Sequence, residues 1–261
     1  MALITLTTDF GSLYPAALRA VILQINESAN IIDITHSIPP ADIRAGAFAL
    51  YSVVEYFPKG TVHVAVVDPG VGTRRRPIAI SAGGQYFVGP DNGLLIPAAR
   101  KLGEMEVYDI RNEKLRCNLS STFHGRDIFA PVGAYLSGGM QLEEVGNKID
   151  DFVDMDSENA EIYGNTIKGE VVFIDDFGNI ITNIPKDMIL KIADLGTELY
   201  VSGNKMPFLR TYGMVGIGDL LALIGSHCFL EISVNQGNAS RVLEIKNHDK
   251  VTVRPLGKRK R

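Results

Sequence analysis

The first third of the chain alternates between short β-rich runs and helical patterns, and this alternation limits the folds open to it. Helical patterns at about 14–26 and 41–57 separate three β-rich runs. Strand–helix–strand order favours a parallel or mixed sheet with helices on both faces. Such sheets bind ligands at the carboxyl ends of their strands. Asp9 stands at the carboxyl end of the first β-rich run, and Asp68 stands at that of the third.

The pattern changes near residue 150, where an acidic, irregular stretch precedes a series of short β signals separated by turns. Short strands at this spacing predict a small sandwich or barrel. We therefore predict an α/β domain over 1–160, with a mostly parallel sheet flanked by helices. An all-β barrel domain is predicted over 161–261. Within the first domain, Gly83-Gly84 between two apolar runs predicts a hairpin.

Charge and cysteine content exclude several classes of protein. Lys and Arg total 26 against 30 Asp and Glu, a net charge of −4, so a nucleic-acid partner is not expected. Cys117 and Cys228 are far apart and indicate neither a disulfide scaffold nor a thiolate site, and no acidic or histidine cluster has metal-ligand spacing. No run reaches membrane-spanning length and no signal peptide is evident, which predicts a cytoplasmic protein without membrane contact or bound metal.

The loop "DPGVGTRRR", residues 68–76, resembles a phosphate loop only superficially. It lacks the Lys-Ser/Thr ending of a P-loop and the third glycine of a dinucleotide fingerprint. By itself it is better explained as a turn. The triplet "DFG" occurs twice, but no kinase lysine strand or catalytic loop accompanies it, so a kinase is not expected.

His124 stands beside Gly125 in a loop that leads into a helical pattern. Glycine lets a ligand approach the backbone, which favours a functional histidine, although a structural hydrogen bond also explains it. Asp127 would cap the following helix.

The stretch "IDDFGNIITN" places Asp175, Phe177 and Asn179 close together. A ring beside carboxylate and amide groups suits a nucleoside, and a polar β-turn explains the pattern equally well.

Taken together, six segments in this order resemble the S-adenosyl-L-methionine (SAM) hydroxide adenosyltransferases, or SAM hydrolases, which are relatives of the SAM-dependent fluorinase and chlorinase. The resemblance runs from about residue 3 to about residue 255. The segments are "TTDFG", "ITHSIPP", "VVDPGVGTRRRPIAI", "FVGPDNGLL", "TFHGRDIFAP" and "DDFGNIITNI".

The resemblance implies an α/β domain, a β-barrel domain, and a homotrimer whose ligand sites lie between subunits. It implies the reaction of SAM with water to adenosine and L-methionine, with SAM as the substrate and no cofactor. The catalytic set that it implies is Asp68, Arg75 and His124. The substrate-binding residues that it implies are Asp9, Phe10, Phe123, Gly125, Asp175, Phe177, Asn179, Ser226, Glu231, Asn235 and Gln236.

Two differences from the relatives bear on the reaction. The fluorinating relative has Tyr-Ser where this chain has His124-Gly125, and a Tyr in place of Asp68, which favours water over halide. Tyr14 and Ala16 stand where family members often carry an acidic residue and a Tyr. A SAM-dependent chlorinase and a non-catalytic SAM- or adenosine-binding protein stay open as alternatives.

The resemblance also selects one of the three adjacent arginines. It assigns Arg75 to the site, and Arg74 and Arg76 are then expected to be solvent or subunit-contact charges.

Overall fold

The computed structural model describes residues 2–117, 120–155 and 159–257. The chain divides into two compact units, Met1–Asp156 and Ser157–Arg261, called here the N-terminal and C-terminal units. Each unit has its own sheet and its own buried apolar core.

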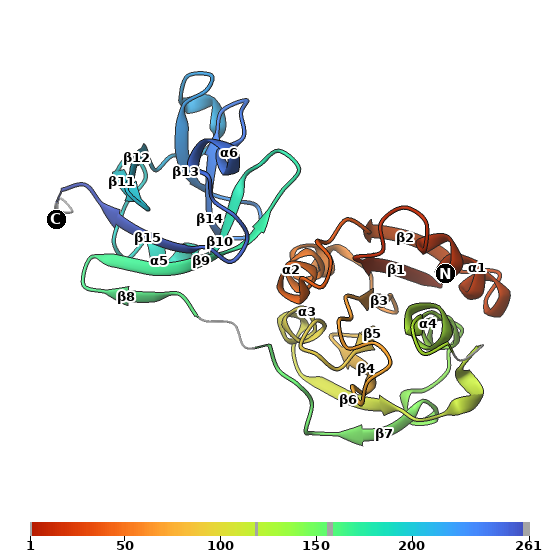
Figure 1. Cartoon of the computed structure of the whole chain (residues 1–261). Helices are drawn as coiled ribbons and strands as arrows, with labels where there is room; N and C mark the ends of the chain where they lie inside the picture. The colour runs from red at the N-terminus through yellow and green to blue at the C-terminus, as the bar shows by residue number, and fades with distance from the viewer. Residues whose placement is uncertain (1, 118–119, 156–158, 258–261) are drawn as a thin grey trace. The chain divides into compact units, whose positions relative to one another are not determined.

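The N-terminal sheet has seven strands in the order β2-β1-β3-β5-β4-β6-β7 (Figure 1). The strands are β1 (Leu3–Thr8), β2 (Asn30–Thr35), β3 (Val62–Val66), β4 (Pro77–Ala82), β5 (Gln85–Pro90), β6 (Met105–Ile110) and β7 (Gly146–Ile149). β2, β1, β3 and β5 are parallel, whereas the pairs β5–β4, β4–β6 and β6–β7 are antiparallel. The sheet is therefore mixed rather than mostly parallel. The Gly83-Gly84 hairpin is one reason, because so short a link can join only antiparallel strands.

Four helices cover the two faces of this sheet. α1 packs against α4 on one face, and α2 packs against α3 on the other (Figure 1). α1 begins with a proline and buries Leu18 and Ile22, one turn apart on the same side. Asp42 caps α2 by accepting from the Ala45 amide over 3.0 Å. The helices are α1 (Pro15–Ile25), α2 (Ile43–Val53), α3 (Ile96–Leu102) and α4 (Ala130–Ser137).

The register of the central strands positions the functional loops. Every residue of β3 is buried, as expected for a strand covered on both faces. Thr8, the last residue of β1, pairs with Val66, the last residue of β3. The two strands thus end level at their carboxyl edge, and the loops carrying Asp9 and Asp68 leave the sheet at that edge.

The C-terminal unit is built on an eight-stranded antiparallel sheet in the order β12-β11-β15-β9-β10-β14-β13, with β8 also paired to β9. A bridge between Phe208 and Ala222 connects the two ends, so the sheet is nearly closed and barrel-like. Two short helices, α5 (Lys186–Ile189) and α6 (Ala239–Leu243), mean that the unit is not wholly β. Its strands are β8 (Glu161–Tyr163), β9 (Thr166–Ile174), β10 (Ile180–Pro185), β11 (Glu198–Val201), β12 (Asn204–Pro207), β13 (Leu220–Ile224), β14 (Phe229–Val234) and β15 (Lys250–Pro255).

Candidate active site

Asp68 and Arg75 form a buried ion pair at the carboxyl edge of the N-terminal sheet. Arg75 Nε donates to Asp68 Oδ1 over 3.0 Å, and Arg75 Nη2 donates to Asp68 Oδ2. The side chains are only 4% (Asp68) and 8% (Arg75) exposed. Two parallel hydrogen bonds fix the orientation of a guanidinium as well as balancing its charge. The loop after β3 therefore folds back so that its two ends meet.

His124 lies against the same guanidinium. Arg75 Nη2 is 2.9 Å from His124 Nδ1. A guanidinium nitrogen can only donate, so Nδ1 is the accepting, unprotonated nitrogen of the ring. Burial, followed by the charge of Arg75, lowers the pKa of His124 from its ordinary 6.5. The imidazole is therefore neutral at neutral pH, with its proton on Nε2.

Within the described part of the chain, one nitrogen of Arg75 has no hydrogen-bond acceptor. Nη1 is buried and lacks a hydrogen-bond partner among the residues that the structure describes. The ring of Phe129 lies beside the guanidinium, with its centre 5.3 Å from the Arg75 Cζ atom. Buried N–H groups are nearly always paired in folded proteins, so Nη1 is a point at which a small acceptor would bind favourably.

A π-helical turn, Gly125–Phe129, follows His124 and continues into α4. The buried Asp127 in this turn accepts from the Ser120 amide over 2.7 Å and from Arg126 Nε over 2.6 Å. Asp127 therefore holds the loop before His124 in place and does not cap the helix. Single π-turns within helices occur frequently at functional sites.

Phe10, Phe123 and Gly125 pack together next to the histidine. The two rings meet edge to face with their centres 5.6 Å apart. A Cβ atom on Gly125 would lie 2.9 Å from carbons of the Phe10 ring, so a larger residue would displace that ring. Asp9, the neighbour of Phe10, accepts from the Ala41 amide over 2.9 Å. The predicted substrate-binding residues Phe10, Phe123 and Gly125 are thus close together. Asp9, which is also predicted to bind substrate, is the chain neighbour of Phe10.

Asp175, Phe177 and Asn179 share one tight turn between β9 and β10. Asp175 Oδ1 accepts from the amides of Phe177 (3.0 Å) and Asn179 (2.8 Å), and Asn179 Nδ2 donates to Asp175 Oδ2 over 2.9 Å. The carboxylate and the amide therefore stabilise the turn itself. The Phe177 side chain is 77% exposed, which leaves its ring free to stack on a ligand.

Glu231 in β14 is the centre of a second polar group in this unit. Its Oε1 atom accepts from the Tyr212 hydroxyl (2.7 Å) and from Ser233 Oγ (2.9 Å). Burial alone would raise the pKa of Glu231, but hydrogen bonds from His227, Tyr212 and Ser233 outweigh it and lower that pKa. Glu231 is therefore a buried anion at neutral pH.

Tyr212 was not identified by the sequence analysis, because no motif surrounds it. Burial, the hydrogen bond to Glu231 and the charges of Glu231 and Asp175 raise the pKa of its hydroxyl. The Tyr212 hydroxyl is therefore influenced by the charges of two predicted binding residues, Glu231 and Asp175.

The remaining predicted binding residues differ in their surroundings. Asn235 Nδ2 donates to the carbonyl of Val215 over 2.9 Å, so its amide stabilises a loop. Ser226 and Gln236 are exposed, and Gln236 has a left-handed backbone with φ of 53°. The side chains of Ser226 and Gln236 are therefore accessible to a ligand.

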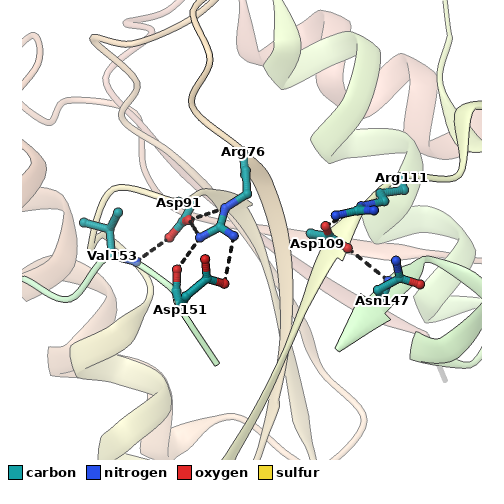
Figure 2. A network of polar contacts seen from close by, with 7 residues as sticks. All are labelled: Arg76, Asp91, Asp109, Arg111, Asn147, Asp151 and Val153. Atoms are coloured by element: carbon teal, nitrogen blue, oxygen red, sulfur yellow. Dashed lines mark hydrogen bonds and ion pairs between the residues drawn. The ribbon is translucent and has the colours of Figure 1, made fainter. Parts of the chain in front are cut away.

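Arg76 was expected to be a solvent or subunit-contact charge; its side chain is 33% exposed, and it is also paired within its own unit. Its guanidinium donates to the buried carboxylate of Asp91 and to Asp151 within the N-terminal unit (Figure 2). The reason is its place immediately before β4, where the side chain points toward the turn after β5. Arg74 is exposed, as expected.

Within the described residues, no group of three or more histidine, cysteine or acidic side chains is arranged to hold a metal ion. No helix in that part of the chain is long and apolar enough to cross a bilayer.

Comparison with known families identifies the chain. One family model, described as the SAM hydroxide adenosyltransferase N-terminal domain, matches residues 4–146, and a second, described as the C-terminal domain, matches residues 169–252. The chain belongs to the SAM hydroxide adenosyltransferase family. The matched residues of the first model include the whole Asp68–Arg75–His124 group, and those of the second include the Asp175 turn and Glu231.

Relatives of this SAM hydroxide adenosyltransferase family cover nearly the full chain. A Methanocaldococcus jannaschii protein named (R)-S-adenosyl-L-methionine hydrolase is 40% identical over 96% of this chain and 95% of its own length. A fluorinase from an Actinoplanes species is 28% identical over 91% of this chain and 92% of its own. The crystal structure of an uncharacterized conserved protein from Thermotoga maritima superimposes with a TM-score of 0.90 at 41% identity, over 96% of this chain and 99% of that one.

Proposed function

We propose that this enzyme hydrolyses SAM to adenosine and L-methionine. Water or hydroxide attacks the ribose C5′ atom, a C–O bond forms, and the C5′–S bond breaks. Its electron pair goes to sulfur, so methionine leaves as a neutral thioether and needs no general acid. One proton is released, and no cofactor is required because the sulfonium itself supplies the leaving group.

The single observation that carries the proposal is the buried Asp68–Arg75–His124 group in a chain whose relatives at 36–40% identity are named SAM hydrolases. Attack on a saturated carbon requires a nucleophile that is separated from bulk solvent and aligned with the C–S bond. Arg75 Nη1 is buried and unpaired among the described residues, so it offers a donor to the attacking oxygen.

The contacts also support a proposal for which residue accepts the proton of the attacking water. His124 Nδ1 accepts from Arg75, and the neutral ring already carries its proton on Nε2, so neither nitrogen is free to take another. Each Asp68 oxygen accepts one hydrogen bond from Arg75 and keeps further lone pairs. We therefore assign Asp68 as the proton acceptor, Arg75 as the group that holds the oxygen, and His124 as an Nε2–H donor.

Substrate recognition is proposed in two parts. Asp9 would bind the ribose hydroxyls, while Phe10, Phe123 and Gly125 would form the apolar wall beside the reacting carbon. A second set would bind the adenine and methionine ends, within the homotrimer that the family resemblance implies. This set comprises Asp175, Phe177, Asn179, Ser226, Glu231, Asn235 and Gln236.

A product assay in H₂¹⁸O and chloride-free buffer tests the reaction. Purified protein with SAM should release L-methionine and adenosine in equal amounts, with ¹⁸O in the 5′-hydroxyl of adenosine by mass spectrometry. Repeating the assay with added chloride tests the chlorinase alternative, which predicts 5′-chloro-5′-deoxyadenosine. Tight adenosine binding without methionine release over hours would instead indicate a binding protein. Light scattering on the same sample tests the trimer.

A further inference from the structure

The loop that carries Asp68 and Arg75 is held at both ends by one turn, the "PDNG" segment that follows β5. At the first end, Asn92 Nδ2 donates to the carbonyl of Val67 over 2.9 Å, and Val67 directly precedes Asp68. At the other end, the turn holds Arg76, which directly follows Arg75.

The second attachment is an ion pair with a buried acid. Arg76 donates to Asp91 Oδ2 from Nε (3.0 Å) and from Nη2 (2.9 Å), and the Asp91 amide donates to the Arg76 carbonyl over 2.9 Å. The Asp91 side chain is 2% exposed, and its Oδ1 atom accepts from the Val153 amide over 2.8 Å. Asp151 binds the outer side of the same guanidinium (Figure 2). Arg76 therefore has little freedom to reorient.

Hydrogen bonds inside the loop are local and cannot replace these attachments. Thr73 donates to the Gly70 carbonyl through both its amide (3.1 Å) and its hydroxyl (2.7 Å), and the Arg75 amide donates to Thr73 Oγ1 over 3.3 Å. These bonds shape the loop, which is exposed at residues 72–74. They do not tie the loop to the sheet, so the place of Arg75 relative to His124 depends on the attachments at the loop ends as well as on its own contacts with Asp68 and Phe129.

We propose that Asp91 and Asn92 are positioning residues for the reaction, which hold Asp68 and Arg75 against His124 without touching substrate. The inference rests on the catalytic assignment made under Proposed function. Catalytic geometry tolerates little displacement, because a shift of about 1 Å can lower a rate about 100-fold.

The chain offers a matched control in Asp109. Its Oδ2 atom accepts from Arg111 Nε over 2.5 Å, and its Oδ1 atom accepts from the Asn147 amide over 3.0 Å (Figure 2). Its side chain is 5% exposed. Asp109 thus has the same kind of partners as Asp91, an arginine and a backbone amide from a distant segment, but it holds β6 to β7 and not the loop.

The first measurement compares Asp91→Asn with Asp109→Asn in the full chain. Asp91→Asn should lower kcat at least about tenfold while the adenosine Kd stays within about twofold. Asp109→Asn should leave kcat within about twofold, even where it lowers the melting temperature as much. Equal losses of kcat in both variants, or parent kcat in Asp91→Asn, would overturn the inference. Asn92→Ala removes the other attachment and should lower kcat in the same way.

The second measurement does not depend on turnover. In ¹⁵N-histidine-labelled protein, the His124 Nδ1 resonance reports the contact with Arg75. It should shift in Asp91→Asn and stay in place in Asp109→Asn, and an unchanged resonance in Asp91→Asn would overturn the inference. A parent protein that releases no methionine would refute the proposed function, and this resonance would still decide whether Asp91 positions Arg75.

Discussion

The Nη2 atom of Arg75 lies 2.9 Å from the Nδ1 atom of His124, and this contact determines which ring nitrogen carries the proton. The guanidinium is a permanent donor, so Nδ1 stays unprotonated as long as the contact persists. In the proposed mechanism the histidine therefore does not act as the base, and Asp68 takes that role.

Turnover should show an acid limb that reflects His124. Burial and Arg75 lower its pKa, so the neutral ring persists below pH 6.5, and further acid places a proton on Nδ1 facing the guanidinium. We expect kcat to fall with a midpoint below pH 6.5. His124→Asn keeps an acceptor near the place of Nδ1 but does not titrate, so its residual activity should lack this limb. Steady-state kinetics from about pH 4.5 to 8 measure the midpoint of this fall in kcat. A midpoint above pH 6.5 would contradict its assignment to His124.

Asp68→Asn should remove the proton acceptor while keeping the size of the side chain. We expect kcat to fall about 100-fold or more, with adenosine affinity changed less than about threefold. Asp154→Asn is the control, because Asp154 also accepts hydrogen bonds from two guanidinium nitrogens of one arginine, Arg100, but at the exposed surface. Methionine release and calorimetric binding of adenosine measure the two effects. Parent turnover in Asp68→Asn would remove it from the mechanism.

Activity should survive removal of divalent metals. The proposed nucleophile is held by Arg75 and activated by Asp68, so no step requires a Lewis acid. We expect kcat after dialysis against a chelator to stay within about twofold of the untreated value. A loss that added Mg²⁺ or Zn²⁺ restores would count against the proposed chemistry.

His63 should make the N-terminal unit sensitive to acid. It is a buried residue of the central strand β3, with Nδ1 hydrogen-bonded to Thr5 Oγ1 (2.7 Å) and Nε2 to Gln85 Oε1 (2.6 Å), and burial lowers its pKa to about 4. The unfolded chain binds this proton near pH 6.5 and the folded chain only near pH 4, so stability falls as pH decreases through that window. The loss from this group reaches about 3 kcal/mol. Urea unfolding at several pH values should show a weaker pH dependence in His63→Gln, and an unchanged one would refute the claim.

Gly178→Ala should destabilise the Asp175 turn by more than Gly196→Ala destabilises its own turn. Both glycines have positive φ, 83° and 90°, so both substitutions strain the backbone by about 1 kcal/mol. A Cβ atom on Gly178 would also clash with the Asn238 side chain, whereas one on Gly196 would have no described residue within 4 Å. We expect the melting temperature to fall several degrees further for Gly178→Ala. Equal shifts would show that Asn238 moves away without cost.

Local patterns predicted much of the N-terminal unit. The helix predicted at about 14–26 is observed as Pro15–Ile25, and the Gly83-Gly84 hairpin is present. These elements depend on apolar spacing, proline and glycine, which are properties of short segments. The strand–helix–strand order allowed a parallel or a mixed sheet, and the expectation of a mostly parallel one was wrong, because strand direction on the far side of β5 depends on which strands meet in space.

Long-range polar partners account for what the sequence analysis missed at the site. Arg76 was expected at the surface, yet its partners Asp91 and Asp151 come from segments 15 and 75 residues away. Tyr212 carries no local signal, and its role follows from Glu231, which is 19 residues distant.

By itself, the sequence determined the order of strands and helices, the family, and the residue types at the site. Apolar periodicity and the order of motifs are properties of the linear sequence and need no knowledge of long-range contacts. Only the tertiary structure decided that Asp68 and Arg75 meet His124, 49 residues after Arg75, and that Arg76 turns inward. The tertiary structure likewise determined that the proton of the neutral His124 ring is on Nε2. Protonation depends on burial and on charges a few ångströms away, and the fold brings those charges together from distant segments.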